Sequence, residues 1–377
     1  MKSSNGLYFS RLDHIRALAA YLVFVWHFTH LTNQFPVPFS AVPPFPFALL
    51  DEGHVGVGLF MTLSGYLFAK LVNGQAINYP AFLWSRAVRL VPLLAASLAA
   101  WYLLGQLHIG PPIDFSQIWR GVLLPTLPNG AWSITIEFQF YLLFPYLLAL
   151  SNRFSPHALL IGICLSLCLR ALLWLRYGEV QLVAYWTIVG AIDQFLMGMF
   201  FATAGLGAKA RRVVAFTCGL LFLIFWQIFD AEGDFFYLDG AYPSPSALWI
   251  VIPSIQAVAF GSFIAWYDNS GISFPPKVDL CLRKVGEWSY SIYLLHFFLR
   301  EVAIFLVKDR GGQDTNFWWA LPAATLLFAA FAPVAGLSFE FFEKPLLRLR
   351  TAYIVRSKKG SAGTAYALKS DPRSRAR

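Results

Sequence analysis

The sequence predicts an all-α fold: a polytopic membrane protein with about ten transmembrane helices in one bundle. The chain of 377 residues is 58% hydrophobic and only 13% charged, which is far more apolar than a soluble domain of this length tolerates. Apolar stretches of about twenty residues recur along it, and each is long enough to cross about 30 Å of hydrocarbon as a helix. Its basic residues also gather on alternate connections, as the positive-inside rule requires.

We expect ten spans in a single domain. They lie at 12–32, 53–73, 87–106, 131–151, 157–177, 185–205, 211–229, 247–267, 288–307 and 317–341. The plan is therefore a cytosolic lead-in at 1–10, a transmembrane domain at 11–346 and a basic cytosolic tail at 347–377, which we expect to be disordered. The first span has charged residues in its opening turns and no small-residue cleavage site behind it, so we expect no cleaved signal peptide.

The net charge of +9 sets the topology of the chain and does not indicate nucleic-acid binding. If the N-terminus is cytosolic and the sides alternate, the basic residues of the external loops are only Arg120, Arg176, Lys308 and Arg310. Arg170 and Arg300 fall within spans, and the other Lys and Arg residues lie toward the inner side. This distribution predicts a multi-pass protein of the inner or plasma membrane with both termini in the cytosol, attracted to anionic lipid headgroups.

The first span, RLDHIRALAAYLVFVWHFTH, carries the main candidate for chemistry. Arg16 and His27 are eleven residues apart, which is almost three helical turns and roughly 16 Å, so both lie on one helix face. An ionisable imidazole deep in a membrane is a functional candidate by default. The alternative is a buried histidine that merely bonds to a neighbouring helix. His30, one turn further on, is a weaker candidate for a cavity wall.

The second and third spans predict an interface and a basic rim. Small residues in GHVGVGLFMTLSGYLFAK at 53–70 let membrane helices approach closely. Arg86 and Arg89 lie three residues apart on one face at the cytosolic end of the third span. Together with Arg16 they form a rim that can grip the phosphates of a polyphosphate cofactor, because guanidiniums bind phosphate oxygens bidentately. The alternative for the pair is topology anchoring.

Other polar residues within spans have two open interpretations. Glu137 lies roughly 9 Å inside the fourth span, at a depth comparable with His27, and either orients a histidine or substrate hydroxyl or pairs with a cation such as Arg170. Asp193, Tyr290 and His296 either line the same cavity or bond across helices. The cysteines Cys164, Cys168, Cys218 and Cys281 have no metal-ligand or disulfide spacing, and we expect no metal site.

Seven motifs in order give the chain a family resemblance. They are LDHIRALAA with Arg16 and His27, GVGLFMTLSGYLFAK, the Arg86 and Arg89 pair leading to Pro92, WSITIEFQFYLLFP with Glu137, DQFLMGMFFA, GEWSYSIYLLH and FEKP. In this the chain resembles the membrane-bound acyltransferase 3 family from about Phe9 to Arg350. His14 stands where the family often has glycine, and ITIEFQFY departs from the commoner form of the fourth motif.

The resemblance implies an O-acyltransferase that moves an acyl group, usually acetyl, from cytosolic acyl-CoA to a hydroxyl of an extracytoplasmic carbohydrate or glycolipid. Under it, Arg16, Arg86 and Arg89 hold the CoA phosphates, and acetyl-CoA is the expected donor. His27 removes the proton of the acceptor hydroxyl as it attacks the thioester. Glu137 orients or charge-stabilises that histidine, and an acyl-imidazole intermediate stays open.

The competing hypothesis is a transporter or flippase for a polar lipid-linked saccharide, with charged interior residues along its route. Against it, no inverted repeat or pair of broken helices is apparent in the sequence. The sequence also lacks a phosphate-binding glycine loop, a zinc-ligand cluster and a GxSxG elbow, the motifs of other common enzyme classes.

Overall fold

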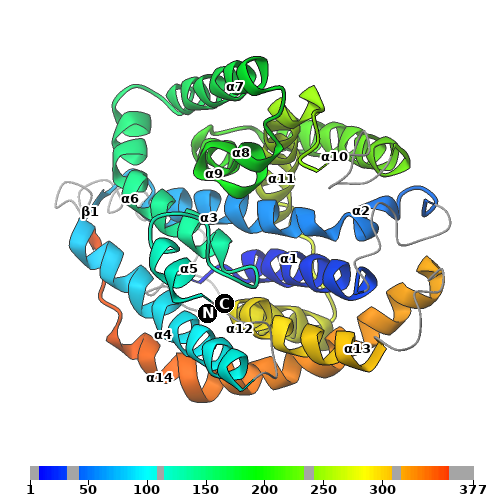
Figure 1. Cartoon of the computed structure of the whole chain (residues 1–377). Helices are drawn as coiled ribbons and strands as arrows, with labels where there is room; N and C mark the ends of the chain where they lie inside the picture. Colours follow the sequence, from blue (N-terminus) through cyan, green and yellow to red (C-terminus); the bar gives the residue numbers. More distant parts are fainter. Residues whose placement is uncertain (1–7, 32–41, 108–113, 233–241, 308–315, 356–377) are drawn as a thin grey trace, which may run out of the picture.

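The computed structural model describes residues 8–31, 42–107, 114–232, 242–307 and 316–355. These residues are almost wholly helical, which confirms the predicted all-α fold, and their helices form one bundle (Figure 1). Each of the ten predicted spans has a helix. Seven helices in the described part are long and apolar enough to cross a membrane.

The elements fall into the principal helices, short connecting turns and one pair of short strands. The principal helices are α1 (Ser10–Thr29), α3 (Gly56–Val72), α4 (Tyr79–Gln106), α6 (Trp132–Arg153), α7 (Ala158–Tyr177), α9 (Ile188–Thr203), α10 (Ala208–Ala231), α11 (Ile252–Asp268), α12 (Pro276–Val307) and α13 (Phe317–Ser338). The short helices are α2 (Ala48–Asp51), η1 (Gly53–Val55), α5 (Phe115–Arg120), α8 (Gln181–Trp186), η3 (Ala247–Ile250), η5 (Phe339–Glu343), α14 (Lys344–Leu346) and η6 (Leu347–Leu349). The strands are β1 (Ala76–Ile77) and β2 (Ile354–Val355).

Helices α1 and α3 run through the centre of the bundle (Figure 1). Helix α1 packs along α12 and also contacts α3 and α13. In the segment 53–72, which contains α3, 78% of the most apolar stretch is buried inside the protein. The corresponding share in α7 is 22%. The polar opening turns of α1 explain why this helix is not among the seven most apolar ones although most of its residues are buried. The first span is thus an internal helix surrounded by protein.

The small residues predicted to form an interface do so between α3 and α9. A Cβ atom on Gly65 would overlap with the carbonyl oxygen of Phe195, and one on Gly198 would overlap with that of Thr62. The two backbones therefore approach each other directly, as small residues allow in membrane helices. This contact fixes α3, and with it one wall of the site.

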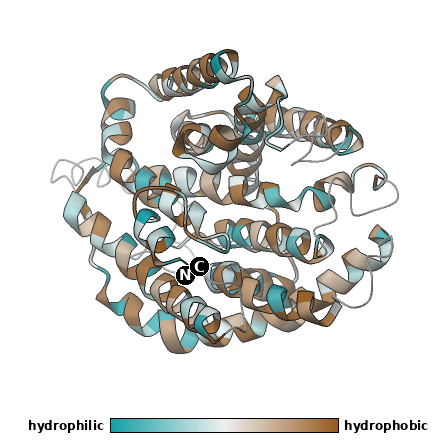
Figure 2. Ribbon diagram, in the orientation of Figure 1, coloured by the Kyte–Doolittle hydropathy of each residue, from teal (hydrophilic) through white to brown (hydrophobic). Residues whose placement is uncertain are grey.

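The outer helices expose the apolar surface that a bilayer would cover. Large hydrophobic side chains recur on the outward faces of α7, α10 and α13, where apolar positions follow one another along the ribbon (Figure 2). Leu165 of α7 is 66% exposed and Leu326 of α13 is 72% exposed. Such a continuous apolar surface on a folded chain indicates contact with lipid.

Two helices, α4 and α12, begin at least eight residues earlier than the sequence predicts, because the prediction followed apolar residues alone. Helix α4 starts at Tyr79, where the side chain of Asn78 accepts a hydrogen bond from the amide of Ala81 and Pro80 occupies the first turn, both common at helix starts. Helix α12 starts at Pro276, so most of the predicted cytosolic connection at 268–287 is helical. Polar helical turns thus extend beyond the apolar spans.

The first residues of the predicted disordered tail are ordered against the domain. Residues 347–349 form η6, and β2 pairs antiparallel with β1, matching Ala76 with Val355. The Tyr353 side chain is 1% exposed and packs against the ring of Phe82. The rest of the tail, 356–377, and residues 1–7 of the lead-in lie outside the described residues.

Candidate active site

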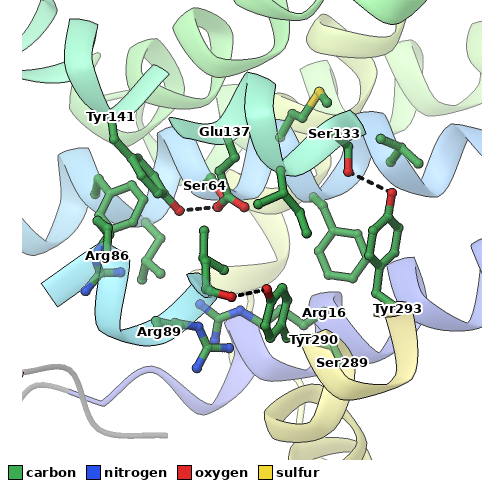
Figure 3. Close-up of a pocket in the computed structure, with 17 residues that line it drawn as sticks. Arg16, Ser64, Arg86, Arg89, Ser133, Glu137, Tyr141, Ser289, Tyr290 and Tyr293 are labelled. Carbon is green, nitrogen blue, oxygen red and sulfur yellow. Dashed lines mark hydrogen bonds between the residues drawn. The ribbon is translucent and has the colours of Figure 1, made fainter. Parts of the chain in front are cut away.

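One pocket gathers the basic and acidic residues that the sequence singles out. Arg16 of α1, Arg86 and Arg89 of α4, Glu137 of α6 and Tyr290 of α12 all line it. Its empty volume, including the space open to solvent, is about 790 Å³. Figure 3 shows Arg16 and Arg89 side by side across the pocket from Glu137. We call it the arginine pocket.

Arg86 is held by aromatic rings and has unused hydrogen-bonding capacity. Its guanidinium carbon lies 4.9 Å from the ring centre of Phe68, 5.8 Å from that of Phe82 and 5.7 Å from that of Tyr353. The side chain is only 7% exposed, and its Nε has no hydrogen-bond partner among the described residues. Cation–π contacts fix the direction of a guanidinium without using its N–H donors. Its buried Nε therefore remains a donor that no described residue uses.

Arg16 and Glu137 are each fixed by neighbouring side chains. Arg16 forms an ion pair with Asp13 one turn earlier on α1. The Glu137 carboxylate accepts a hydrogen bond of 3.1 Å from the Ser64 hydroxyl and another from the Tyr141 hydroxyl. Glu137 therefore lies in the pocket with the arginines, beside Ser64. It does not line the cavity of His27, so the structure does not place it where it could orient that histidine. The depth estimate from α6 alone had no information on the rotation of the helix.

His27 lines a second cavity, further along α1. This cavity has an empty volume of about 1060 Å³, and we call it the histidine cavity. Its walls are unusually aromatic, with Trp26, Trp132, Tyr185, Trp186, Tyr293 and Phe297 among them. Arg300 of α12 lines it as well. Flat aromatic faces together with the polar side chains of His54, Asn129 and Arg300 suit an organic ligand with alternating apolar and hydroxyl surfaces.

The hydrogen bonds around His27 determine which ring nitrogen can act as a base. His27 Nδ1 lies 2.8 Å from the carbonyl oxygen of Val23, and His296 Nδ1 lies 3.1 Å from that of Ile292. Because a carbonyl oxygen only accepts, both rings carry their proton on Nδ1. His296 Nε2, 3.3 Å from His27 Nδ1, then offers its lone pair to that N–H group. His27 Nε2 is left with a lone pair, as a general base requires.

The two cavities meet at Val57 and Tyr293, which line both. The Tyr293 hydroxyl lies 2.7 Å from the Ser133 hydroxyl and 2.8 Å from the carbonyl oxygen of Gly130, to which it donates. These bonds join α12 to the start of α6 at the junction. The sequence predicts one cavity from Arg16 to His27, and the structure has two neighbouring cavities with this shared wall.

Three of the predicted cavity residues line neither cavity. One of them, His296, bonds across helices to His27. Asp193 accepts a 2.7 Å hydrogen bond from Arg170, and both side chains are fully buried. Ser254 also donates to that carboxylate. Asp193 is therefore the partner of Arg170, which answers the alternative that assigned Glu137 to this arginine. His30 lies beside Asp51, with 3.5 Å between Nε2 and the carboxylate oxygen. It thus connects the end of α1 to α2.

The sequence analysis missed several residues of the two cavities. Ser64, Tyr141 and Ser133 line the arginine pocket, and Arg300 lines the histidine cavity. Tyr141 is one helical turn after Glu137, so helix geometry alone places it within reach. Arg300, one turn after His296 on α12, carries the same signal. Ser64 has no such signal, because its contact depends on how α3 packs against α6.

Comparisons with known proteins show which family the chain resembles. A family model described as an acyltransferase domain matches residues 9–336. The chain is 25% identical to peptidoglycan O-acetyltransferase OatA of Listeria monocytogenes, over 90% of this chain and 56% of that protein. It is 24% identical to O-acetyltransferase OatA of Staphylococcus aureus, over 77% of this chain and 50% of that protein.

A relative of similar length also matches. Nodulation protein 10 of Rhizobium leguminosarum is 23% identical over 92% of this chain and 95% of its own length. The chain thus spans about half the length of the two OatA proteins. No solved structure matches the chain.

Proposed function

The chain belongs to the acyltransferase family that its motifs predict, and from this membership we propose that it O-acetylates a carbohydrate of the cell envelope with acyl-CoA as donor. The observation that carries the proposal is the placement of a basic pocket and a histidine base at two neighbouring cavities along α1. Two OatA relatives are named as O-acetyltransferases, one of them of peptidoglycan. Peptidoglycan or another envelope glycan is therefore the acceptor we expect.

The arginine pocket is the site for the CoA phosphates. Three guanidiniums face it, and Arg86 keeps buried N–H capacity that no described residue uses. Arginine binds phosphate oxygens through two parallel hydrogen bonds. The positive-inside rule puts this end of the bundle in the cytosol, where acyl-CoA is made. Acetyl-CoA then enters from the cytosolic side with its pantetheine arm directed toward Val57 and Tyr293.

The histidine cavity is the site for the acceptor. It lies beyond the shared wall, further toward the opposite end of α1, so it faces the extracytoplasmic half of the membrane when the basic end is cytosolic. Trp132 and Trp186 contact each other at its wall with ring centres 4.5 Å apart. Aromatic faces pack against the C–H faces of sugar rings, while the hydroxyl groups stay free for hydrogen bonding. A sugar hydroxyl bound here reaches His27.

The reaction then follows from the tautomer of His27. Its Nε2 takes the proton of the acceptor hydroxyl while the hydroxyl oxygen attacks the thioester carbonyl carbon. The carbon–sulfur bond breaks, the acetyl group passes to the sugar oxygen, and the CoA thiolate leaves and takes up a proton. His296 stabilises the imidazolium, because its Nε2 accepts from the protonated Nδ1 of His27. Arg16 and His27 are roughly 16 Å apart along α1, a distance that the extended pantetheine arm covers.

Acetyl transfer by the purified full chain tests this proposal. We expect acetyl-CoA and a glycan acceptor to yield free CoA and an acetylated glycan, detected by mass spectrometry, and His27→Ala to lower the rate about 10²- to 10⁴-fold. Leu18→Met, at a position of the same helix that is exposed and lines neither cavity, is the matched control and should keep the rate. Ordinary turnover by His27→Ala would defeat the proposal.

The same assay separates acyl transfer from the transporter hypothesis. A flippase would move a lipid-linked saccharide without releasing CoA from acetyl-CoA, and family membership favours transfer. Mass spectrometry of envelope glycans from cells with and without the chain then identifies the acceptor. Loss of O-acetyl groups from one glycan in the deletion strain is the result we expect.

A further inference from the structure

A short C-terminal segment crosses the outside of α4 next to the arginine pocket. Residues 347–355, which we call the strap, lie beyond the region that the family model matches. The Trp84 indole donates a 2.9 Å hydrogen bond to the carbonyl oxygen of Leu349, and the Ser85 hydroxyl donates a 2.8 Å bond to that of Thr351. The strap is therefore fixed by the two residues that precede Arg86.

This placement brings a fourth arginine, Arg350, next to the arginine pocket, beside the residues that precede Arg86. Arg350 lies between the two strap residues that α4 holds, Leu349 and Thr351. Partial burial, followed by the positive charges of Arg89 and Arg86, lowers the pKa of Arg350 to about 10. The Arg350 Nε donates a 3.1 Å hydrogen bond to the carbonyl oxygen of Leu347, and the positive charges of Arg86 and Arg89 act on its guanidinium. Three residues further on, the Tyr353 ring contacts the guanidinium of Arg86 directly.

The cluster has the electrostatics of a site for a polyanion. Like charges repel, so the clustering of Arg86, Arg89 and Arg350 carries an electrostatic cost. Binding of an anion would relieve this repulsion, and more strongly in a partly buried place. Arg86 is 7% exposed with an Nε that has no described partner. Two carboxylates offset part of this charge, because Glu343 interacts with Arg89 and Glu137 lines the pocket with Arg86. The three arginines still outnumber them.

We propose that Arg350 binds the 3′-phosphate of CoA, with the strap as the outer wall of the donor site. The proposal rests on the proposed function and adds a residue and a subsite to it. Arg16, Arg86 and Arg89 line the pocket itself, whereas Arg350 extends the basic surface outward along α4. In CoA the diphosphate joins the pantetheine arm, and the 3′-phosphate on the ribose lies further from the thioester. The outermost arginine therefore meets the outermost phosphate.

Equilibrium binding of CoA and of 3′-dephospho-CoA to the detergent-purified full chain tests this contact. We expect the parent chain to bind CoA more tightly than 3′-dephospho-CoA. Arg350→Ala should weaken CoA binding about tenfold, since a charge-assisted hydrogen bond is lost, and should leave 3′-dephospho-CoA binding unchanged. Arg350→Lys keeps the positive charge but loses the planar guanidinium group. Its affinity for CoA should therefore lie between those of the parent chain and Arg350→Ala.

Arg348→Ala is the matched control, because Arg348 is exposed on the same strap and should bind both nucleotides like the parent. A strap loosened by the substitution would weaken both nucleotides alike, so the ratio of the two dissociation constants isolates the 3′-phosphate. Equal losses for both nucleotides in Arg350→Ala would overturn the inference. A parent chain that discriminates between them but transfers no acetyl group would refute the proposed function and leave this inference standing.

Discussion

Replacing His296 tests whether the pair of histidines works as the tautomer argument requires. His296 is 1% exposed, and its Nε2 lies 3.3 Å from His27 Nδ1. When His27 takes up a proton, this contact becomes a hydrogen bond from a cation, worth about 1.5–3 kcal/mol. Since about 1.4 kcal/mol corresponds to a factor of ten in rate, His296→Leu should lower kcat about 10- to 150-fold. KM for acetyl-CoA should stay the same.

Two further variants separate positioning from packing. His296→Gln places an amide oxygen near the same point, so it should recover part of the lost rate, which a purely structural role would not predict. If His296 acts only through His27, the double variant His27→Ala/His296→Leu should be no slower than His27→Ala alone. The assay is release of CoA thiol with a glycan acceptor, on protein that elutes as a single species in detergent.

Two results would refute the reasoning about this pair. One is a double variant whose losses multiply, because then His296 would act on the reaction independently of His27. The other is a His296→Leu variant with parental kcat, because then the contact with His27 would have no role in stabilising the imidazolium.

Three other predictions concern the donor site, the buried ion pair and the helix packing. Arg86→Ala should weaken acetyl-CoA binding by about 1.5–3 kcal/mol and leave the KM of the acceptor unchanged. If the variant binds acetyl-CoA as tightly as the parent chain, Arg86 does not bind the phosphates. Asp193→Ala leaves a fully buried arginine without its carboxylate partner and should destabilise the fold by about 3–5 kcal/mol. Glu340→Ala, which removes only the pairs with exposed Lys284 and Lys344, should cost about 0–1 kcal/mol in thermal unfolding. Gly198→Leu should reduce the yield of folded protein through its overlap with α3, while Gly219→Leu, with open space around it, should not.

The helices were predictable because composition and length decide them. Each apolar stretch has to form its backbone hydrogen bonds internally in a bilayer, and a helix does so at every position. The start of α12 at Pro276 was not predictable in this way, because Lys, Arg and Glu also form stable helix and the boundary prediction counted apolar residues. The packing of β2 on β1 depends on two segments that are far apart in the sequence, and no local pattern indicates it.

The candidate site was predictable only along single helices. Arg86 and Arg89 share a face by helix geometry, and the structure places both in the arginine pocket. The partner of Glu137 was not predictable, because Ser64 comes from another helix and the rotation of two packed helices is set by contacts along their whole length. The same reason explains Asp193, whose arginine partner lies on α7.

Val57 and Tyr293 separate the two cavities, so the proposed reaction requires the acyl group to pass between them. In the proposed mechanism the donor phosphates lie near Arg16 and the base is His27, so the thioester has to pass this point for its carbonyl carbon to reach His27. The Tyr293 hydroxyl bonds to Ser133 and to Gly130, and both of these belong to the region where α6 begins. Opening the wall therefore means breaking contacts between α12 and α6. Because α12 also carries His296, the helix that would admit the acyl group is the helix that supports the base.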